Sequence, residues 1–184
     1  MKRAAWLTLL LSTAAFAHKA SDSYLTLTPH DSEVRARWDI ALKDLDGELD
    51  LDADGDGKIR WSEVEARKPA LLAYALAHLK LAQTGAACPA QPASLRLTRH
   101  SDGVYAVLDF AFVCAGPVHQ ATLDYSLLFD VDAQHRGLVR LAGAGESWVG
   151  FLTRRASSQS IRSTILDTPH SLRNYPGFFR FENG

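Results

Sequence analysis

The sequence predicts a mainly β protein, and three observations support this prediction. Several short segments alternate apolar and polar residues with a period of two, as half-buried strands do. Asp, Gly, Pro and Ser residues, which favour turns, separate these segments. Only the region at about 61–81 is rich in residues that favour helices. The chain has 184 residues, of which 47% are hydrophobic and 22% charged, which is the composition of one modest globular domain.

The first 17 residues, MKRAAWLTLLLSTAAFA, have the pattern of a secretory signal peptide. Lys2 and Arg3 form a basic start, a short apolar centre follows, and Ala15-Phe16-Ala17 is a small-residue cleavage site. The apolar centre is too short for a transmembrane helix, which needs about 20 apolar residues. We therefore expect an exported protein, periplasmic or on the extracellular face of the inner membrane, whose mature chain begins at His18.

The clearest candidate strand is Glu33–Leu42, EVRARWDIAL, in which the apolar residues fall on one side. The other candidate strands are Ser23–Leu27, Ser94–Thr98, Val104–Val113, Thr122–Val131, Gly137–Leu141 and Ser147–Leu152. The pair Asp102-Gly103 predicts a hairpin between two of them. Seven short strands with frequent turn signals indicate an immunoglobulin-like β-sandwich, which we assign to residues 18–167, with residues 168–184 as a C-terminal tail or linker.

The predicted sandwich carries an insertion at about residues 44–81. A short helix interrupted by glycine is expected at about Asp44–Leu51, before the region of strong helix formers. Pro69 divides that region, because a proline inside a helix removes a hydrogen bond and clashes with the preceding turn. The sequence therefore predicts one helix that ends at about Arg67 and a second that begins near Pro69 and extends to about Leu81.

The strongest chemical signal is DADGDGKIRWSE at residues 52–63, which fits the twelve-residue pattern D-x-D-x-D-G-x5-E of an EF-hand calcium loop. The expected ligands are the carboxylates of Asp52, Asp54 and Asp56, the backbone carbonyl of Lys58 and a bidentate Glu63. Gly57 permits the sharp turn at the sixth position. So many hard oxygen ligands favour Ca²⁺ over the smaller Mg²⁺. The alternative is a solvated acidic loop that binds no ion.

Two features indicate weak affinity, on the order of 10⁻⁴ to 10⁻³ M, and a structural role for the ion. Arg60, at the ninth position, brings a positive charge to the rim of the loop, and the sequence contains no second loop of this kind. We therefore expect an EF-hand-like loop inserted between a strand and a helix.

Export also bears on the two cysteines. In an oxidising compartment Cys88 and Cys114 are expected to form a disulfide, and two buried free thiols are the alternative.

A second metal hypothesis concerns the mature N-terminus. The α-amine and the imidazole of His18 would together suit Cu²⁺, so a periplasmic copper-binding protein is the alternative function. A further histidine would have to converge on His18. The candidates are His30, His100, His119, His135 and His170.

Three segments, HKASDSYLTL, RWDIALKDLDGELDLDADGDGKIRWSEV and LLFDVDAQHRGLVRL, together resemble the exported N-terminal region of HupE/UreJ-like membrane proteins. The resemblance implies an extracytoplasmic β-rich domain that precedes a membrane part with several helices, and a transport or accessory role in metal metabolism. Because the chain ends at about the point where those helices would begin, it is expected to be a fragment or a stand-alone version with a membrane protein as its partner.

Composition and motifs exclude other classes. Lys and Arg number 20 against 21 Asp and Glu, and no basic block is present, which argues against a nucleic acid partner. We find no nucleophile elbow, phosphate loop or zinc-type His-Glu motif, so no catalytic residue or small-molecule substrate is identified. The sequence thus favours a non-enzymatic, exported calcium-binding sandwich that serves as a sensing or docking ectodomain for a membrane protein.

Overall fold

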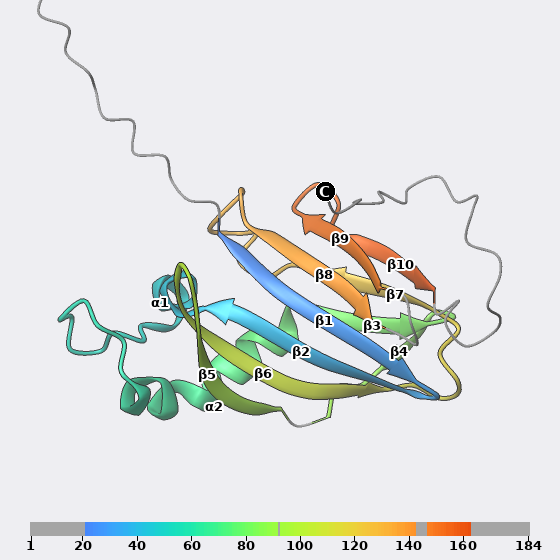
Figure 1. Ribbon diagram of the computed structural model, residues 1–184, viewed down its shortest axis with the longest axis horizontal. Helices are drawn as coiled ribbons and strands as arrows, with labels where there is room; N and C mark the ends of the chain where they lie inside the picture. Colours follow the sequence, from blue (N-terminus) through green and yellow to red (C-terminus); the bar gives the residue numbers. More distant parts are fainter. Residues whose placement is uncertain (1–20, 92, 143–146, 163–184) are drawn as a thin grey trace, which may run out of the picture.

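Two packed β-sheets form the body of the protein, as the sequence predicts. The computed structural model describes residues 21–91, 93–142 and 147–162 (Figure 1). The larger sheet contains, in spatial order, β5 (Ser94–His100), β6 (Gly103–Val113), β2 (Glu33–Ala41), β1 (Asp22–His30), β8 (Arg136–Ala142) and β9 (Ser147–Thr153). The smaller sheet contains β10 (Ser158–Arg162), β7 (Gln120–Tyr125), β3 (Leu79–Gln83) and β4 (Ala86–Cys88). The predictions of a mainly β chain and of a sandwich are confirmed, whereas the immunoglobulin type of the sandwich remains an expectation.

A strand is present at each of the seven predicted places, and alternating polarity is the reason. The strand predicted at Thr122–Val131 is shorter, because β7 ends at Tyr125 and turns follow it. In β1, for example, Ser23, Leu25 and Leu27 point into the core, and the residues between them point outward. The predicted hairpin is also confirmed, because β5 and β6 pair antiparallel from Ser94↔Asp109 to His100↔Gly103. Most neighbouring strands pair antiparallel, but β1 and β8 are parallel, which requires the long connection through both sheets.

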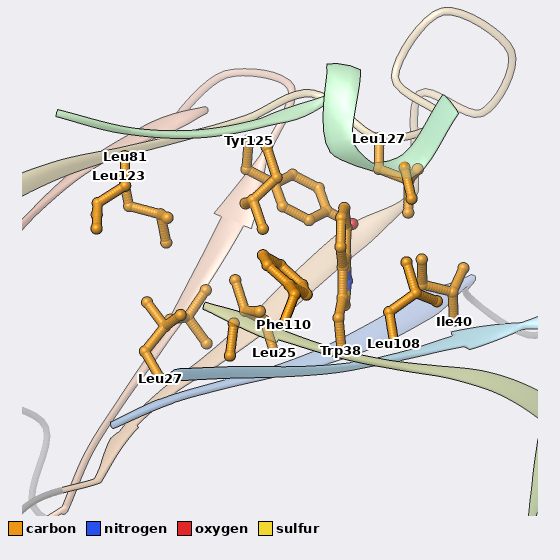
Figure 2. Close-up of a cluster of buried hydrophobic side chains, with 14 of the residues drawn as sticks. Leu25, Leu27, Trp38, Ile40, Leu81, Leu108, Phe110, Leu123, Tyr125 and Leu127 are labelled. Atoms are coloured by element: carbon orange, nitrogen blue, oxygen red, sulfur yellow. The ribbon is translucent and has the colours of Figure 1, made fainter. Parts of the chain in front are cut away.

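The core lies between the two sheets and is built mainly from aliphatic side chains around Trp38 and Tyr125 (Figure 2). The two rings have centroids 5.6 Å apart and an interplanar angle of 60°. Gly137 on β8 makes room for this packing, because a Cβ at that position would lie 2.8 Å from the Tyr125 ring. The labelled core residues come from the larger sheet (Leu25, Leu27, Ile40, Leu108, Phe110), from the smaller sheet (Leu81, Leu123) and from the turn after β7 (Leu127).

One continuous helix, α2 (Trp61–Ala77), replaces the two helices predicted on either side of Pro69. Val64 and Leu71 lie seven residues apart on the same face of α2 and are fully buried. Pro69 is exposed, so water can solvate the carbonyl group that loses its hydrogen bond. Burial of apolar side chains before and after the proline therefore outweighs its local cost, and the prediction of two helices was wrong.

The sequence also missed three short strands. Residues from Leu79 onward, which we predicted as the end of a helix, form β3, and the hairpin continues into β4. Residues 158–160, which look like a polar linker, begin β10. Local composition favours other structures in these segments. β3 and β10 become strands by pairing with the two sides of β7, and β4 becomes a strand by pairing with β3.

Cys88 and Cys114 form a disulfide, with their Cα atoms 4.4 Å apart. Cys88 ends β4 in the smaller sheet, and Cys114 follows β6 in the larger sheet. The bond therefore ties the two sheets together at one end. The alternative of two free thiols is excluded.

Candidate metal site

The loop at residues 52–63 joins two helices. The predicted short helix is present as α1 (Leu42–Leu49), so the local arrangement is helix, loop, helix. β2 runs directly into α1, which is why the alternating pattern of Glu33–Leu42 left little sequence for an entering helix. Leu45 of α1 and Val64 of α2 belong to the common core and fix both ends of the loop.

The loop is shaped by backbone hydrogen bonds to aspartate side chains. Asp52 accepts hydrogen bonds from the backbone N–H groups of Asp56 at 3.2 Å and of Gly57 at 2.8 Å. Gly57 has a φ of +78°, a conformation that other residues rarely adopt, so the glycine at the sixth position has a structural cause. Ile59 is half-buried against the core and anchors the loop. These bonds fix the turn at Gly57 and the position of the Asp52 carboxylate.

Three of the predicted ligands lie together. One carboxylate oxygen each from Asp52, Asp54 and Glu63 can be chosen so that all lie within 4.8 Å of one another. Asp54 is exposed, and Asp52 and Glu63 are half-buried. Glu63 also accepts hydrogen bonds from the backbone N–H groups of Ala53 at 3.2 Å and Arg60 at 2.8 Å. The set contains only hard oxygen donors, which is the chemistry that Ca²⁺ prefers.

Asp56, which is also a predicted ligand, does not join this group of three carboxylates. Asp56 pairs with Arg60, whose guanidinium also lies 3.1 Å from Asp54 and 4.0 Å from Glu63. Arg60 lowers the pKa of Asp56 through their hydrogen bond. Lys58 is exposed and donates its backbone N–H to Asp56 at 2.9 Å. Arg60 therefore acts as an internal counter-ion for the carboxylates that a metal ion would need.

The loop is also connected to α1. The backbone N–H of Asp52 donates to the carboxylate of Asp46 at 2.8 Å, and Asp50, at the C-cap of α1, has a left-handed backbone with φ of 50°. Glu63 is the third residue of α2. A metal ion held by Asp52 and Glu63 would consequently link the end of α1 to the start of α2.

The histidine hypothesis receives no support from the part of the chain that the structure describes. His18 and His170 lie outside the described residues. His100 lies 3.0 Å from Asp39 and stacks on Tyr24, with ring centroids 5.5 Å apart. His30 and His119 are exposed on the surface.

His135 belongs to a buried chain of hydrogen bonds that the sequence analysis missed. Its Nδ1 atom lies 2.5 Å from the Ser21 hydroxyl, and its Nε2 atom lies 2.5 Å from the Tyr125 hydroxyl. Ser21 donates to Asp44 of α1 at 2.8 Å. At the other end, Ser23 lies 2.8 Å from Tyr125 and accepts from the Trp38 indole at 3.1 Å. Both ring nitrogens of His135 are thus occupied, so it is unsuited to complete a copper site.

The donor and acceptor in each of these hydrogen bonds follow from the two groups at the ends of the network, Asp44 and Trp38. A carboxylate only accepts and an indole N–H only donates, so Ser21 gives its proton to Asp44 and accepts from the Nδ1–H of His135. The Nε2 atom of a neutral His135 then accepts from Tyr125, which accepts from Ser23. Burial lowers the pKa of His135 and raises that of Tyr125, so both groups stay neutral in the core.

Comparison with known proteins adds no functional assignment. No protein-family model matches the chain, and no curated protein has significant similarity to it. Within the described residues, none of the helices has the length and apolar character needed to cross a membrane. Function must therefore be argued from the loop itself.

Proposed function

We propose that this protein is a non-enzymatic, exported calcium-binding β-sandwich that serves as a sensing or docking ectodomain for a membrane protein. The observation that carries the proposal is the convergence of the carboxylates of Asp52, Asp54 and Glu63 within 4.8 Å, in a loop with the spacing of an EF-hand. A bound Ca²⁺ would neutralise these carboxylates, with Asp56 and the carbonyl of Lys58 completing the ligands.

The position of the loop suggests a structural role for the ion. Asp46 of α1 holds the start of the loop, and Glu63 lies in the first turn of α2. Calcium would join these two helices, both of which contribute to the core. A single, weak site of this kind acts as a cross-link at the calcium concentrations found outside cells.

Export and membrane association rest on different support. The N-terminal pattern of residues 1–17 is that of a secretory signal, and the Cys88–Cys114 disulfide is compatible with an oxidising compartment. The membrane partner, with a metal-transport or accessory role, is inferred from the resemblance to the exported region of HupE/UreJ-like proteins.

Thermal unfolding with and without calcium tests the proposal. For a dissociation constant of about 10⁻⁴ M, about 10⁻² M Ca²⁺ stabilises the folded chain by about 2.7 kcal/mol, which raises Tm by about 5–10 °C. Mg²⁺ at the same concentration should raise Tm less. Glu63→Gln removes one ligand charge and should weaken calcium binding by about tenfold or more.

The matched control is Glu65→Gln, which changes an exposed glutamate two residues further along the same helix. This variant should keep the full calcium-dependent rise in Tm. An equal rise in Glu63→Gln would contradict the proposal. A rise with equimolar Cu²⁺ and none with Ca²⁺ would instead favour the alternative site at His18.

A further inference from the structure

β9 is an edge strand of the larger sheet with an apolar, uncharged sequence, SWVGFLT. One side of β9 pairs with β8 from Arg136↔Thr153 to Ala142↔Ser147. Within residues 21–91, 93–142 and 147–162, its other side meets no strand, apart from the isolated bridge between Thr153 and Ala156. Figure 1 shows β9 at the end of the larger sheet, beyond β8.

The exposed side chains of β9 also distinguish it. Val149 and Phe151 are 49% and 52% exposed, and they account for two of the four large hydrophobic side chains that are well exposed in the described part of the chain. Both point to the outer face of the larger sheet. The Phe151 ring lies 5.9 Å from the guanidinium carbon of Arg136, which is itself paired with Asp22 at 2.8 Å. Arg136 therefore helps to position the Phe151 ring on the surface, and the charge of Arg136 is already neutralised by Asp22.

The other three edge strands carry features that oppose the addition of a further strand. β5 contains Arg96, Arg99 and His100, and β4 is only three residues long. β10, with the sequence SQSIR, is short and polar. β9 has seven residues, no charge and no proline, so it is the edge best suited to pair with another strand.

The sequence of β9 is complementary to itself. In an antiparallel pair centred on Gly150, Val149 lies opposite Phe151 of the second copy, which is a favourable pairing of a β-branched with an aromatic residue. Trp148 lies opposite Leu152, and the pairing ends there, because the backbone N–H and C=O of Thr153 are already bonded to Ala156 of the same chain. The Trp148 ring folds across Gly150, where a Cβ would lie 2.2 Å from the ring, so Trp148 covers the centre of β9 on the face that packs against the core.

We propose that two copies of this chain associate by antiparallel pairing of β9 with β9, which joins the two larger sheets into one continuous sheet. The absence of charge on β9 means that no repulsion opposes a two-fold contact. A pair of such short strands buries less surface than the roughly 800 Å² per partner of a stable complex, so the dimer should be weak and dependent on concentration.

Sedimentation velocity of the purified chain from micromolar to near-millimolar concentration tests this association. The unmodified chain should shift from monomer to dimer. Val149→Lys places a charge on the exposed edge without touching the core and should abolish the dimer. Ser94→Lys, which puts the same charge on the exposed start of β5 at the opposite edge of the sheet, should leave the dimer intact. Thermal unfolding of both variants confirms that they fold.

Disulfide cross-linking tests the register. A mixture of Val149→Cys and Phe151→Cys chains should form a cross-linked dimer under mild oxidation, because these positions face each other, and either variant alone should form much less. A chain that stays monomeric at all concentrations overturns the proposal, and so does a dimer that survives Val149→Lys. Cross-linking of Val149→Cys alone at the level of the mixture overturns the proposed register.

Discussion

His135 shows how one residue can connect distant parts of the fold. It links Ser21, at the start of the described chain, to Tyr125 at the end of β7, and through Ser21 it reaches Asp44 on α1. All hydrogen-bonding groups of the ring are satisfied, which a buried histidine requires. No periodic pattern in the sequence indicates this role, because Ser21 lies 114 residues before His135 and the contact depends on the folded sheets.

The buried position of His135 makes stability depend on pH. Burial lowers its pKa below the ordinary value of 6.5, although Asp44, Asp132 and Asp22 act in the opposite direction. The unfolded chain thus takes up the proton at a higher pH than the folded chain. Stability from this group is therefore complete above pH 6.5 and is lost as the pH falls below that value.

The variant His135→Gln separates this effect from other titrations. At pH 8 it should be less stable by about 1–3 kcal/mol, because an amide reproduces the two hydrogen bonds imperfectly. The difference from the unmodified chain should narrow as the pH falls from 7 to 5. Urea unfolding over this pH range measures both quantities, and parallel curves would contradict a neutral, buried His135.

At the scale of an element, the loop at residues 52–63 contains both the expected calcium ligands and a positively charged side chain, Arg60, that competes with calcium for them. Arg60 pairs with Asp54 and Asp56, so calcium must displace the guanidinium before it can use these carboxylates. Arg60→Ser should therefore bind calcium severalfold more tightly, as measured by isothermal titration calorimetry.

Arg67→Ser is the control for this prediction. Arg67 lies in α2 and is 3.3 Å from Asp50, which is outside the loop. The Arg67→Ser variant removes one positive charge, as Arg60→Ser does, but it breaks no ion pair with a predicted calcium ligand. Its effect on calcium affinity should therefore be small. Equal or weaker affinity in Arg60→Ser would show that Arg60 does not compete with the ion.

The elements also show which features a sequence can predict. Alternation predicted β1, β2 and β5–β9 because apolar side chains on one face of each strand pack into the core. The loop motif placed Asp52, Asp54 and Glu63 together because its spacing is short. The prediction of two helices separated at Pro69 was wrong, because the burial of Val64 and Leu71 that holds α2 together depends on the rest of the fold. The pairing of Asp56 with Arg60 was equally hidden, since the motif describes ligands and not their competitors.

At the scale of the whole molecule, the disulfide and the candidate metal site lie in separate places. The disulfide joins the end of β4 to the end of β6, and next to it the backbone N–H of Val113 donates to the carbonyl of Pro89 at 3.0 Å. The loop at residues 52–63 lies at the opposite end of the molecule from β4 (Figure 1). The Cys88–Cys114 disulfide and an ion bound at the candidate metal site should consequently make independent contributions to the free energy of unfolding.

Replacement of both Cys88 and Cys114 by Ala tests this independence. The disulfide closes a loop with a sequence separation of 26 residues, so its loss should lower the free energy of unfolding by about 3 kcal/mol, through the greater freedom of the unfolded chain. Urea unfolding measures this change. Under native conditions calcium affinity, measured by calorimetry, should stay the same, because the loop depends on α1 and α2 and not on β4. A large loss of affinity in a variant that still folds would mean that the disulfide positions the loop, and the two ends of the sandwich would then have to act as one unit.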